Sequence, residues 1–255
     1  MEATSITNTK KLIRTFLYAF KSKFNTIFLK KTTVSSSCQI PDLQEKYQQL
    51  RFGNTNKTNI NKIFVEIGGN DGETCSNTSF LADQGWRGLY VEPIKDLATF
   101  AKIRHIFNDV SVENVAISES NGTQLIYSMG LLTTLSLDNV RVYSELDWSK
   151  SYTSNMKEIT IQTKTLENVF KRHNIPFVFD LLVVDVEGHE ETIINSLFLS
   201  SWKPNVIIIE LEDQHKQFKT FSVIADSHSK TRKMIVENGY IEFWKDDVNT
   251  IFKRI

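Results

Sequence analysis

Regular alternation between short apolar runs and helical patterns constrains the fold of this chain more than any other feature. The apolar runs have strand length and lie at 62–67, 88–92, 110–117, 180–185 and 205–210. Helical patterns fall at 77–84, 94–105, 165–173, 189–198 and 222–238. Two further strand-like segments, 240–244 and 248–254, suggest a terminal antiparallel hairpin. Strands separated by helices form parallel sheets covered on both faces. We therefore predict an α/β domain over 61–255, built on a mostly parallel, doubly wound sheet of about seven strands.

One segment breaks this alternation. Residues 128–158 are rich in Ser and Thr and contain Tyr143, Trp148 and Tyr152. In an open α/β sheet, ligands bind beyond the carboxyl ends of the strands, and loops that carry function cover that edge. We interpret 128–158 as an insertion that shapes the pocket of an acceptor molecule.

The N-terminal segment carries a charge of its own. The chain has 30 basic and 30 acidic residues, yet residues 1–31 hold seven basic residues against Glu2, so 7 − 1 leaves +6 there and −6 elsewhere. Apolar residues recur at helical spacing within 10–31, which predicts a basic amphipathic helix, and a polar connector with a short helix near 43–51 follows to residue 60. Interrupting charges argue against a spanning helix. Two interpretations stay open: a helix lying on an anionic membrane, or a helix packed on its own domain or on a second subunit.

The amino-acid composition limits which binding partners and which cellular compartment we expect for this protein. Zero net charge argues against general nucleic-acid binding, which depends on neutralising phosphates. Cys38 and Cys75 are too few for a disulfide framework or a cysteine-rich zinc site, and no clean secretory signal is present. We expect a cytoplasmic protein, held at the membrane surface if residues 10–31 bind lipid.

A glycine-rich turn follows the first strand in 63–78, IFVEIGGNDGETCSNT. Such a turn brings backbone amides close to a ligand. No Gly-Lys-Ser/Thr is present, which excludes a P-loop, and the dinucleotide spacing G-x-G-x-x-G is absent. Glu66 would face a pyrophosphate unfavourably but suits an ammonium group, and Glu92, after the second strand, can accept hydrogen bonds from ribose hydroxyls. A ribose joined to an amino acid without phosphates describes S-adenosylmethionine.

An acidic cluster follows a later strand in LLVVDVEGHE, 181–190. Asp185 ends the strand, and Glu187, His189 and Glu190 come directly after it. Three carboxylates and an imidazole within six residues repel and desolvate one another, which a structural turn would not require. Methyl transfer to a hydroxyl needs a base for the departing proton. We take Asp185, Glu187 and His189 as the candidate catalytic residues.

The next strand repeats this layout in VIIIELEDQH, 206–215. Asp185, Glu210 and Asp213 would offer the oxygen ligands that Mg²⁺ prefers. Alternatively, the acidic rim hydrogen-bonds a polyhydroxylated acceptor such as a sugar without any metal, and we favour this interpretation. His105, His173 and His228 have no partners at ligand spacing and are predicted to be surface residues.

The segment 63–93 resembles the opening of the FkbM-type S-adenosylmethionine-dependent methyltransferases. That family has a V-E/D-I-G-A-x-x-G turn, an S-N-T helix start and a G-W-x-G-x-x-x-E-P second strand in the same order, with Gly69 of this chain in place of the usual Ala. VSVENVAIS at 110–118 and the D-x-E-G-x-E pattern at 185–190 extend the resemblance, which runs from about residue 61 to 213. The resemblance implies a Rossmann-like class I methyltransferase.

The turn and the resemblance together give the candidate cofactor-binding residues. Glu66 and Gly68 would hold the methionine part, Glu92 the ribose, and Asn114, Val115 and Ala116 the adenine. The full set is Glu66, Gly68, Gly69, Asn70, Asp71, Gly72, Ser76, Asn77, Glu92, Asn114, Val115, Ala116 and Asp185. The implied activity is methyl transfer to a hydroxyl of a sugar or small-molecule acceptor. The alternatives are a non-catalytic, membrane-associated interaction protein on the same fold, and a nicotinamide-dependent oxidoreductase, against which Glu66 and the glycine spacing count.

Overall fold

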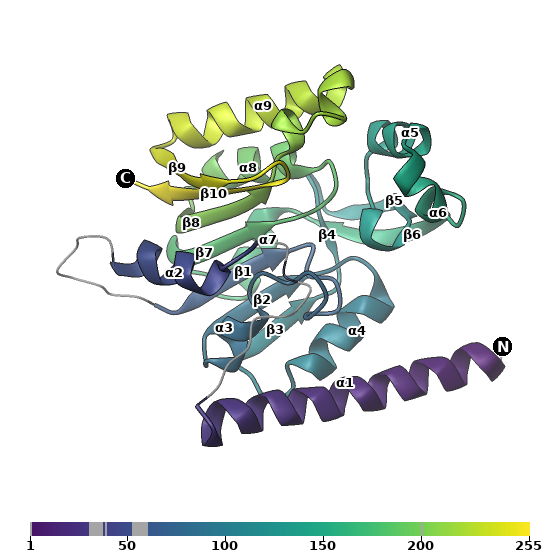
Figure 1. Ribbon diagram of the computed structural model, residues 1–255, viewed down its shortest axis with the longest axis vertical. Helices are drawn as coiled ribbons and strands as arrows, with labels where there is room; N and C mark the ends of the chain where they lie inside the picture. The colour runs from purple at the N-terminus through teal and green to yellow at the C-terminus, as the bar shows by residue number, and fades with distance from the viewer. Residues whose placement is uncertain (1, 31–37, 39, 53–60, 200) are drawn as a thin grey trace. The chain divides into compact units, whose positions relative to one another are not determined.

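The computed structural model describes residues 2–30, 38, 40–52, 61–199 and 201–255. The chain forms two compact units, Met1–Asn114 and Val115–Ile255, and Figure 1 labels their helices and strands. Seven strands form a mostly parallel sheet, with β3-β2-β1 from the first unit and β7-β8-β10-β9 from the second. The predicted α/β class and strand number are confirmed. Most of the predicted connector, residues 31–37, 39 and 53–60, lies outside the described residues.

The first unit begins with helices and continues as parallel strands joined by helices. Its elements are α1 (Glu2–Phe28), α2 (Leu43–Phe52), β1 (Ile63–Ile67), α3 (Ser79–Asp83), β2 (Arg87–Val91), α4 (Lys95–Arg104) and β3 (Val110–Glu113). β2 pairs in parallel with β1 on one side and β3 on the other. All five residues of β1 are buried, as expected for a parallel strand covered on both faces. This arrangement brings the ends of β1 and β2 to one edge.

The second unit contains the acidic strand ends and the insertion. Its strands and α-helices are β4 (Ala116–Ile117), β5 (Gly122–Ser128), α5 (Leu137–Glu145), α6 (Lys150–Thr153), β6 (Lys157–Lys164), α7 (Leu166–Arg172), β7 (Val178–Val184), α8 (Glu190–Leu199), β8 (Lys203–Glu210), α9 (Ser222–Glu237), β9 (Tyr240–Lys245) and β10 (Asn249–Arg254). Short 3₁₀ turns cover Gly130–Leu132, Asp147–Ser149, Glu212–Gln214 and Phe218–Thr220. β7 and β8 are parallel, and β10 pairs antiparallel with β8 and β9, which confirms the terminal hairpin.

The prediction of a single strand over 110–117 is wrong. The chain leaves the large sheet after β3, and β4 joins β6 and β5 in a separate three-stranded sheet. The break lies at Asn114, whose side-chain amide donates to the carbonyls of Glu92 and Pro93 at 2.9 Å each. These bonds hold Asn114 at the end of β2 and turn the chain away from the sheet.

The insertion is bracketed by the antiparallel strands β5 and β6, which the alternation of apolar runs did not predict. α5, α6 and two short turns lie between these strands. Tyr143 and Val142 of α5 pack with Met129, Phe218 and Ile224 in a core of their own. The insertion is therefore a packed substructure.

Candidate functional site

The glycine loop, residues 68–72, is anchored to the end of β2. The amides of Gly68 and Gly69 donate to the carbonyl of Val91 at 2.9 and 3.1 Å. Gly68, Asn70 and Gly72 have φ of 87°, 47° and 75°, in the left-handed region that Gly and Asn tolerate best. The sharp turn expected after the first strand is therefore formed by the residue types that suit it.

Gly69 departs from the family pattern for a steric reason. A Cβ on Gly69 would lie 2.6 Å from Cδ1 of Tyr90, a fully buried side chain of β2. The Tyr90 ring stacks on His105 with centroids 4.9 Å apart, and Nε2 of His105 lies 2.9 Å from the carbonyl oxygen of Gly72. The surface prediction for His105 is wrong, because its side chain is 2% exposed and supports the loop. Burial, with Arg104 beside it, lowers the pKa of His105 to about 3 and keeps the ring neutral.

Glu66 organises the segment that follows the loop. Its carboxylate is 3% exposed and accepts hydrogen bonds from the Ser76 hydroxyl at 2.9 Å, the Asn77 amide at 3.2 Å and the Thr78 hydroxyl. The helix begins at Ser79, later than predicted, although the Ser76 hydroxyl still accepts from the amides of Thr78 and Ser79. The structure thus brings Glu66, Ser76 and Asn77 together, and their contact with a cofactor stays a prediction.

Glu92 lies beside the glycine loop. One carboxylate oxygen accepts from the Asn70 amide at 2.9 Å, and the other accepts from the Ile94 amide at 2.8 Å. Asn114 is fixed to the backbone of Glu92, as described above. In the first unit, the predicted ribose residue, the loop and the predicted adenine residue Asn114 therefore come together. Val115 and Ala116 open the second unit as buried residues.

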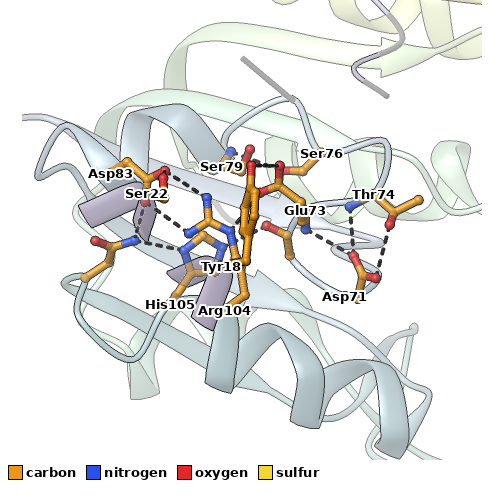
Figure 2. Close-up of polar contacts among 12 residues, drawn as sticks. Tyr18, Ser22, Asp71, Glu73, Thr74, Ser76, Ser79, Asp83, Arg104 and His105 are labelled. Atoms are coloured by element: carbon orange, nitrogen blue, oxygen red, sulfur yellow. Dashed lines mark hydrogen bonds and ion pairs between the residues drawn. The ribbon is translucent and has the colours of Figure 1, made fainter. Parts of the chain in front are cut away.

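A charged network links the end of the loop to α1, α3 and α4 (Figure 2). Asp71 accepts from the amides of Glu73 and Thr74, which closes a local turn. Glu73 accepts from Nε of Arg104 at 2.7 Å and from the Tyr18 hydroxyl at 3.0 Å. The Asp71 carboxylate shapes the loop, and its contact with the cofactor stays a prediction.

Arg104 is the centre of that network. Its side chain is 2% exposed, and it donates to both oxygens of Asp83 at 3.0 and 2.8 Å. Although burial opposes it, the guanidinium of Arg104 holds the pKa of Asp83 below its usual value. The sequence analysis did not predict the ion pair between Arg104 and Asp83. The one sign of it in the sequence is that a carboxylate, Asp83, ends the mostly apolar segment SFLAD.

Three carboxylates converge in the second unit. Asp185 follows β7, Glu187 lies in the next turn and Glu210 ends β8, and one oxygen of each lies within 4.8 Å of the others. Burial raises the pKa of all three, and neighbouring negative charges raise those of Glu187 and Glu210 further. Each of these three carboxyl groups therefore holds a proton more tightly than it would in water. Oε2 of Glu210, a residue 9% exposed, has no hydrogen-bond partner within the described part of the chain.

The turn that carries Glu187 is fixed by the insertion. The Tyr143 hydroxyl of α5 donates to the Glu187 carboxylate, and the Thr134 hydroxyl donates to the Glu187 carbonyl. Gly188 has φ of 99°, and a Cβ there would lie 2.3 Å from Oδ1 of Asn139. Tyr143 is only 1% exposed, so it supports the carboxylate cluster as a buried side chain.

His228 completes the buried polar set beside this turn. Its Nδ1 accepts from the Glu212 amide at 2.9 Å, and its Nε2 lies 3.4 Å from Glu190. Because Nδ1 accepts, the proton of the neutral ring lies on Nε2 and points to Glu190. The surface prediction for His228 is wrong, because the side chain is 3% exposed. Glu190 also accepts from the Gly188 amide at 3.0 Å, which ties α8 to the turn.

Two predicted residues, Asp213 and His189, remain to be placed. Asp213 forms a two-bond ion pair with Arg232 at 2.6 and 2.9 Å, so Glu187 takes its place beside Asp185 and Glu210. Nε2 of His189 is buried and has no hydrogen-bond partner among the residues that the structure describes, and burial lowers the pKa of this ring. His189 is therefore neutral near pH 7.

Comparison with known proteins gives one family match. The model of the methyltransferase FkbM domain matches residues 66–242. No curated protein sequence matches the chain. Among solved structures, TomG, an O-methyltransferase from Streptomyces achromogenes involved in tomaymycin synthesis and solved with S-adenosylmethionine, is 11% identical, with 93% of this chain and 89% of that chain covered and a TM-score of 0.45. An O-methyltransferase from Bacillus cereus solved with S-adenosylhomocysteine is 12% identical, with 93% and 99% covered and a TM-score of 0.42.

Proposed function

The chain belongs to the FkbM methyltransferase domain family, and from this premise we propose that it methylates a hydroxyl oxygen of a sugar or another small molecule. The methyl donor is S-adenosylmethionine. Transfer breaks the bond between the methyl carbon and sulfur, forms a bond from that carbon to oxygen, and releases the hydroxyl proton. Family membership favours this activity over the nicotinamide-dependent alternative.

The first unit supplies the donor site in this proposal. When bound, S-adenosylmethionine supplies a methyl group activated by its positive sulfur. Glu92 fits the ribose, because the Asn70 and Ile94 amides fix its carboxylate beside the glycine loop. Glu66 lies buried under the loop and contributes negative charge on the side where the methionine ammonium is expected. Asn114, fixed to the backbone of Glu92, would border the adenine.

The carboxylate cluster of the second unit supplies the base, and this is the observation that carries the proposal. A carboxylate in water is too weak a base for a hydroxyl near pH 7, and a raised pKa improves it. Asp185, Glu187 and Glu210 all have raised pKa values. We assign proton acceptance to Asp185, which lies in this cluster with Glu187 and Glu210, while Glu187 and the neutral His189 orient the acceptor.

A divalent cation is a second way to satisfy the same three carboxylates. The unpartnered Oε2 of Glu210 and the 4.8 Å grouping fit the oxygen ligands that Mg²⁺ requires. Titration of the protein with MgCl₂ in two buffers of different ionisation enthalpy tests this. Because the pKa values of these carboxyl groups are raised, cation binding would release protons from them and make the heat depend on the buffer, whereas a rim that works by hydrogen bonding alone gives no binding.

The decisive assay follows the methyl group of labelled S-adenosylmethionine into a panel of sugars, sugar nucleotides and phenols. Asp185→Asn should lower kcat by about a hundredfold or more, the size of a lost general base, and this loss should exceed any weakening of donor binding measured by calorimetry. Glu92→Ala should weaken donor binding by about tenfold to a hundredfold, the value of a charged hydrogen bond.

Each result has a distinct meaning. Absence of binding to both S-adenosylmethionine and S-adenosylhomocysteine would refute the proposal. If the unaltered chain and Asp185→Asn both bind the donor and neither transfers its methyl group to any acceptor, the result would favour the non-catalytic interaction protein.

A further inference from the structure

α1 packs on the first unit through its less apolar face. The inward positions are held by mostly small or polar residues, namely Leu12, Thr15, Ala19, Ser22 and Thr26. The large apolar residues point elsewhere and are 42–68% exposed: Ile13, Phe16, Leu17, Phe20, Phe24, Ile27 and Phe28. We call this second set the apolar stripe. An amphipathic helix normally buries its apolar face, so the orientation of α1 is the reverse of the usual one.

Helical geometry separates the two faces cleanly. At about 100° per residue, the apolar stripe spans an arc of about 120°, and its centre lies about 140° from the centre of the packed face. Lys10, Arg14 and Lys21 fall along one edge of the stripe, and all three are exposed. From residue 3 to residue 31 the sequence contains no acidic residue. The exposed side of α1 therefore joins an apolar surface to an unopposed row of cations.

Polar contacts hold this orientation in place. The Ser22 hydroxyl donates to Asp83, Tyr18 donates to Glu73, and Nζ of Lys23 donates to Asn108 at 3.0 Å. Figure 2 shows Tyr18 and Ser22 of α1 reaching this network. Rolling the stripe inward would break these bonds and remove one donor, Ser22, from the buried Asp83 carboxylate, which is costly.

The body of the first unit extends the apolar surface. Phe107, which follows α4 and is 41% exposed, lies with its ring centroid 5.7 Å from Phe16 and 6.2 Å from Phe20. The neighbouring Ile106 is 56% exposed. The stripe is therefore part of a continuous surface that α1 and the unit present together.

We propose that the apolar stripe docks α1 in the plane of an anionic lipid bilayer. Phe, Leu and Ile enter the boundary between headgroups and acyl chains, while Lys10, Arg14 and Lys21 reach the lipid phosphates and carboxylates. Among the described residues, no helix is long and apolar enough to cross a membrane. The proposal is independent of the methyl-transfer reaction.

Charge distinguishes this partner from a second copy of the chain. A symmetric dimer along the stripe would set Lys10, Arg14 and Lys21 of one copy beside the same residues of the other, and the sequence has no acidic residue from 3 to 31 to separate them. An anionic bilayer instead meets the apolar and the basic parts of the surface at the same time.

Co-sedimentation of the full chain with vesicles tests the proposal. We expect binding to phosphatidylcholine vesicles that contain about one third phosphatidylserine, and much weaker binding to pure phosphatidylcholine. Lys10→Gln/Arg14→Gln/Lys21→Gln should weaken binding to the anionic vesicles by about a hundredfold, at about a factor of five for each charge. Phe20→Asp/Phe24→Asp should abolish it.

A matched variant separates the stripe from a general effect of added charge. Leu137→Asp/Val223→Asp adds the same two charges at exposed apolar positions, 52% and 58% exposed, near the starts of α5 and α9. This variant should bind vesicles nearly as the unaltered chain does. Circular dichroism establishes that each variant is folded. A Phe24→Trp variant should also show a blue shift of its added fluorescence with anionic vesicles, since the ring leaves water.

Two results would overturn the proposal. One is equal vesicle binding by folded Phe20→Asp/Phe24→Asp and by the unaltered chain, or no binding by the unaltered chain at all. The other is a dimer in sedimentation equilibrium that Phe20→Asp/Phe24→Asp converts to monomer, since that would assign the stripe to a second copy.

Discussion

Glu212→Gln should stabilise the protein at alkaline pH and should stabilise it less under mild acid. Burial raises the pKa of the Glu212 carboxyl from 4.5 to about 7, with Glu190 and Asp185 adding to the effect and His228 opposing it. The folded state then binds a proton that the unfolded chain releases, so the free energy of unfolding falls as the pH rises from about 4.5 to about 7. Above about pH 7 the Glu212 carboxylate is ionised in both states, and the free energy of unfolding is lowered by the full amount that the pKa shift implies.

The magnitude follows from the size of the shift. One pKa unit corresponds to about 1.4 kcal/mol, so the ionised carboxylate costs about 3 kcal/mol at about pH 8.5 and about 1.5 kcal/mol at about pH 5.5. Gln cannot ionise and escapes both penalties. The gain in the free energy of unfolding from Glu212→Gln should therefore be larger at about pH 8.5 by about 2 kcal/mol.

Urea unfolding of both proteins at the two pH values measures this difference. Glu158→Gln, at an exposed position on β6, serves as the control and should change stability little at either pH. A gain from Glu212→Gln that is the same at both pH values would refute the reasoning, because it would show that Glu212 ionises at similar pH in the folded and unfolded chain.

Three further substitutions test the packing of the site. Gly69→Ala should destabilise the protein by about 1–3 kcal/mol in urea unfolding, because its Cβ would overlap Tyr90, and a loss below about 0.5 kcal/mol would contradict this close approach. Gly188→Ala should cost about as much, through its positive φ and the contact with Asn139, and should lower methyl transfer more than donor binding. Asp83→Asn should cost about 3–5 kcal/mol by leaving Arg104 underpaired, and hydrogen exchange should rise first in α1.

The strands of the large sheet could be predicted from sequence because most of their residues are buried. β1 and β7 appear as nearly continuous apolar runs, as parallel strands covered on both faces do. β5 and β6 could not be predicted in this way, since most of their residues are exposed and their stability comes from pairing with each other. Asn114 broke the predicted third strand through side-chain bonds to residues about twenty positions earlier, which no local pattern reveals.

The residues of the candidate site also differ in whether they could be predicted from sequence. Glu92 in the first unit, and Asp185 with Glu210 in the second, could be found because functional side chains follow the carboxyl ends of parallel strands. The residues that support the cluster could not be found in this way. Tyr143 donates to Glu187, which lies 44 positions away in the sequence, and Nδ1 of His228 accepts from the Glu212 amide, 16 positions away. Asp213 looked equivalent to Glu210 in sequence, and only the fold pairs it with Arg232.

The reversed orientation of α1 bears on what its apolar pattern is for. If that pattern served folding alone, Phe16, Phe20 and Phe24 would be buried, and each would contribute about 2 kcal/mol or more by leaving water. They are 42–57% exposed, while Ala19 and Ser22 occupy the interface with the unit. The free energy that these rings do not contribute to folding remains available for docking. Because Tyr18 and Ser22 already secure the other face, a bilayer can bind the stripe without displacing α1 or the charged network at the end of the glycine loop.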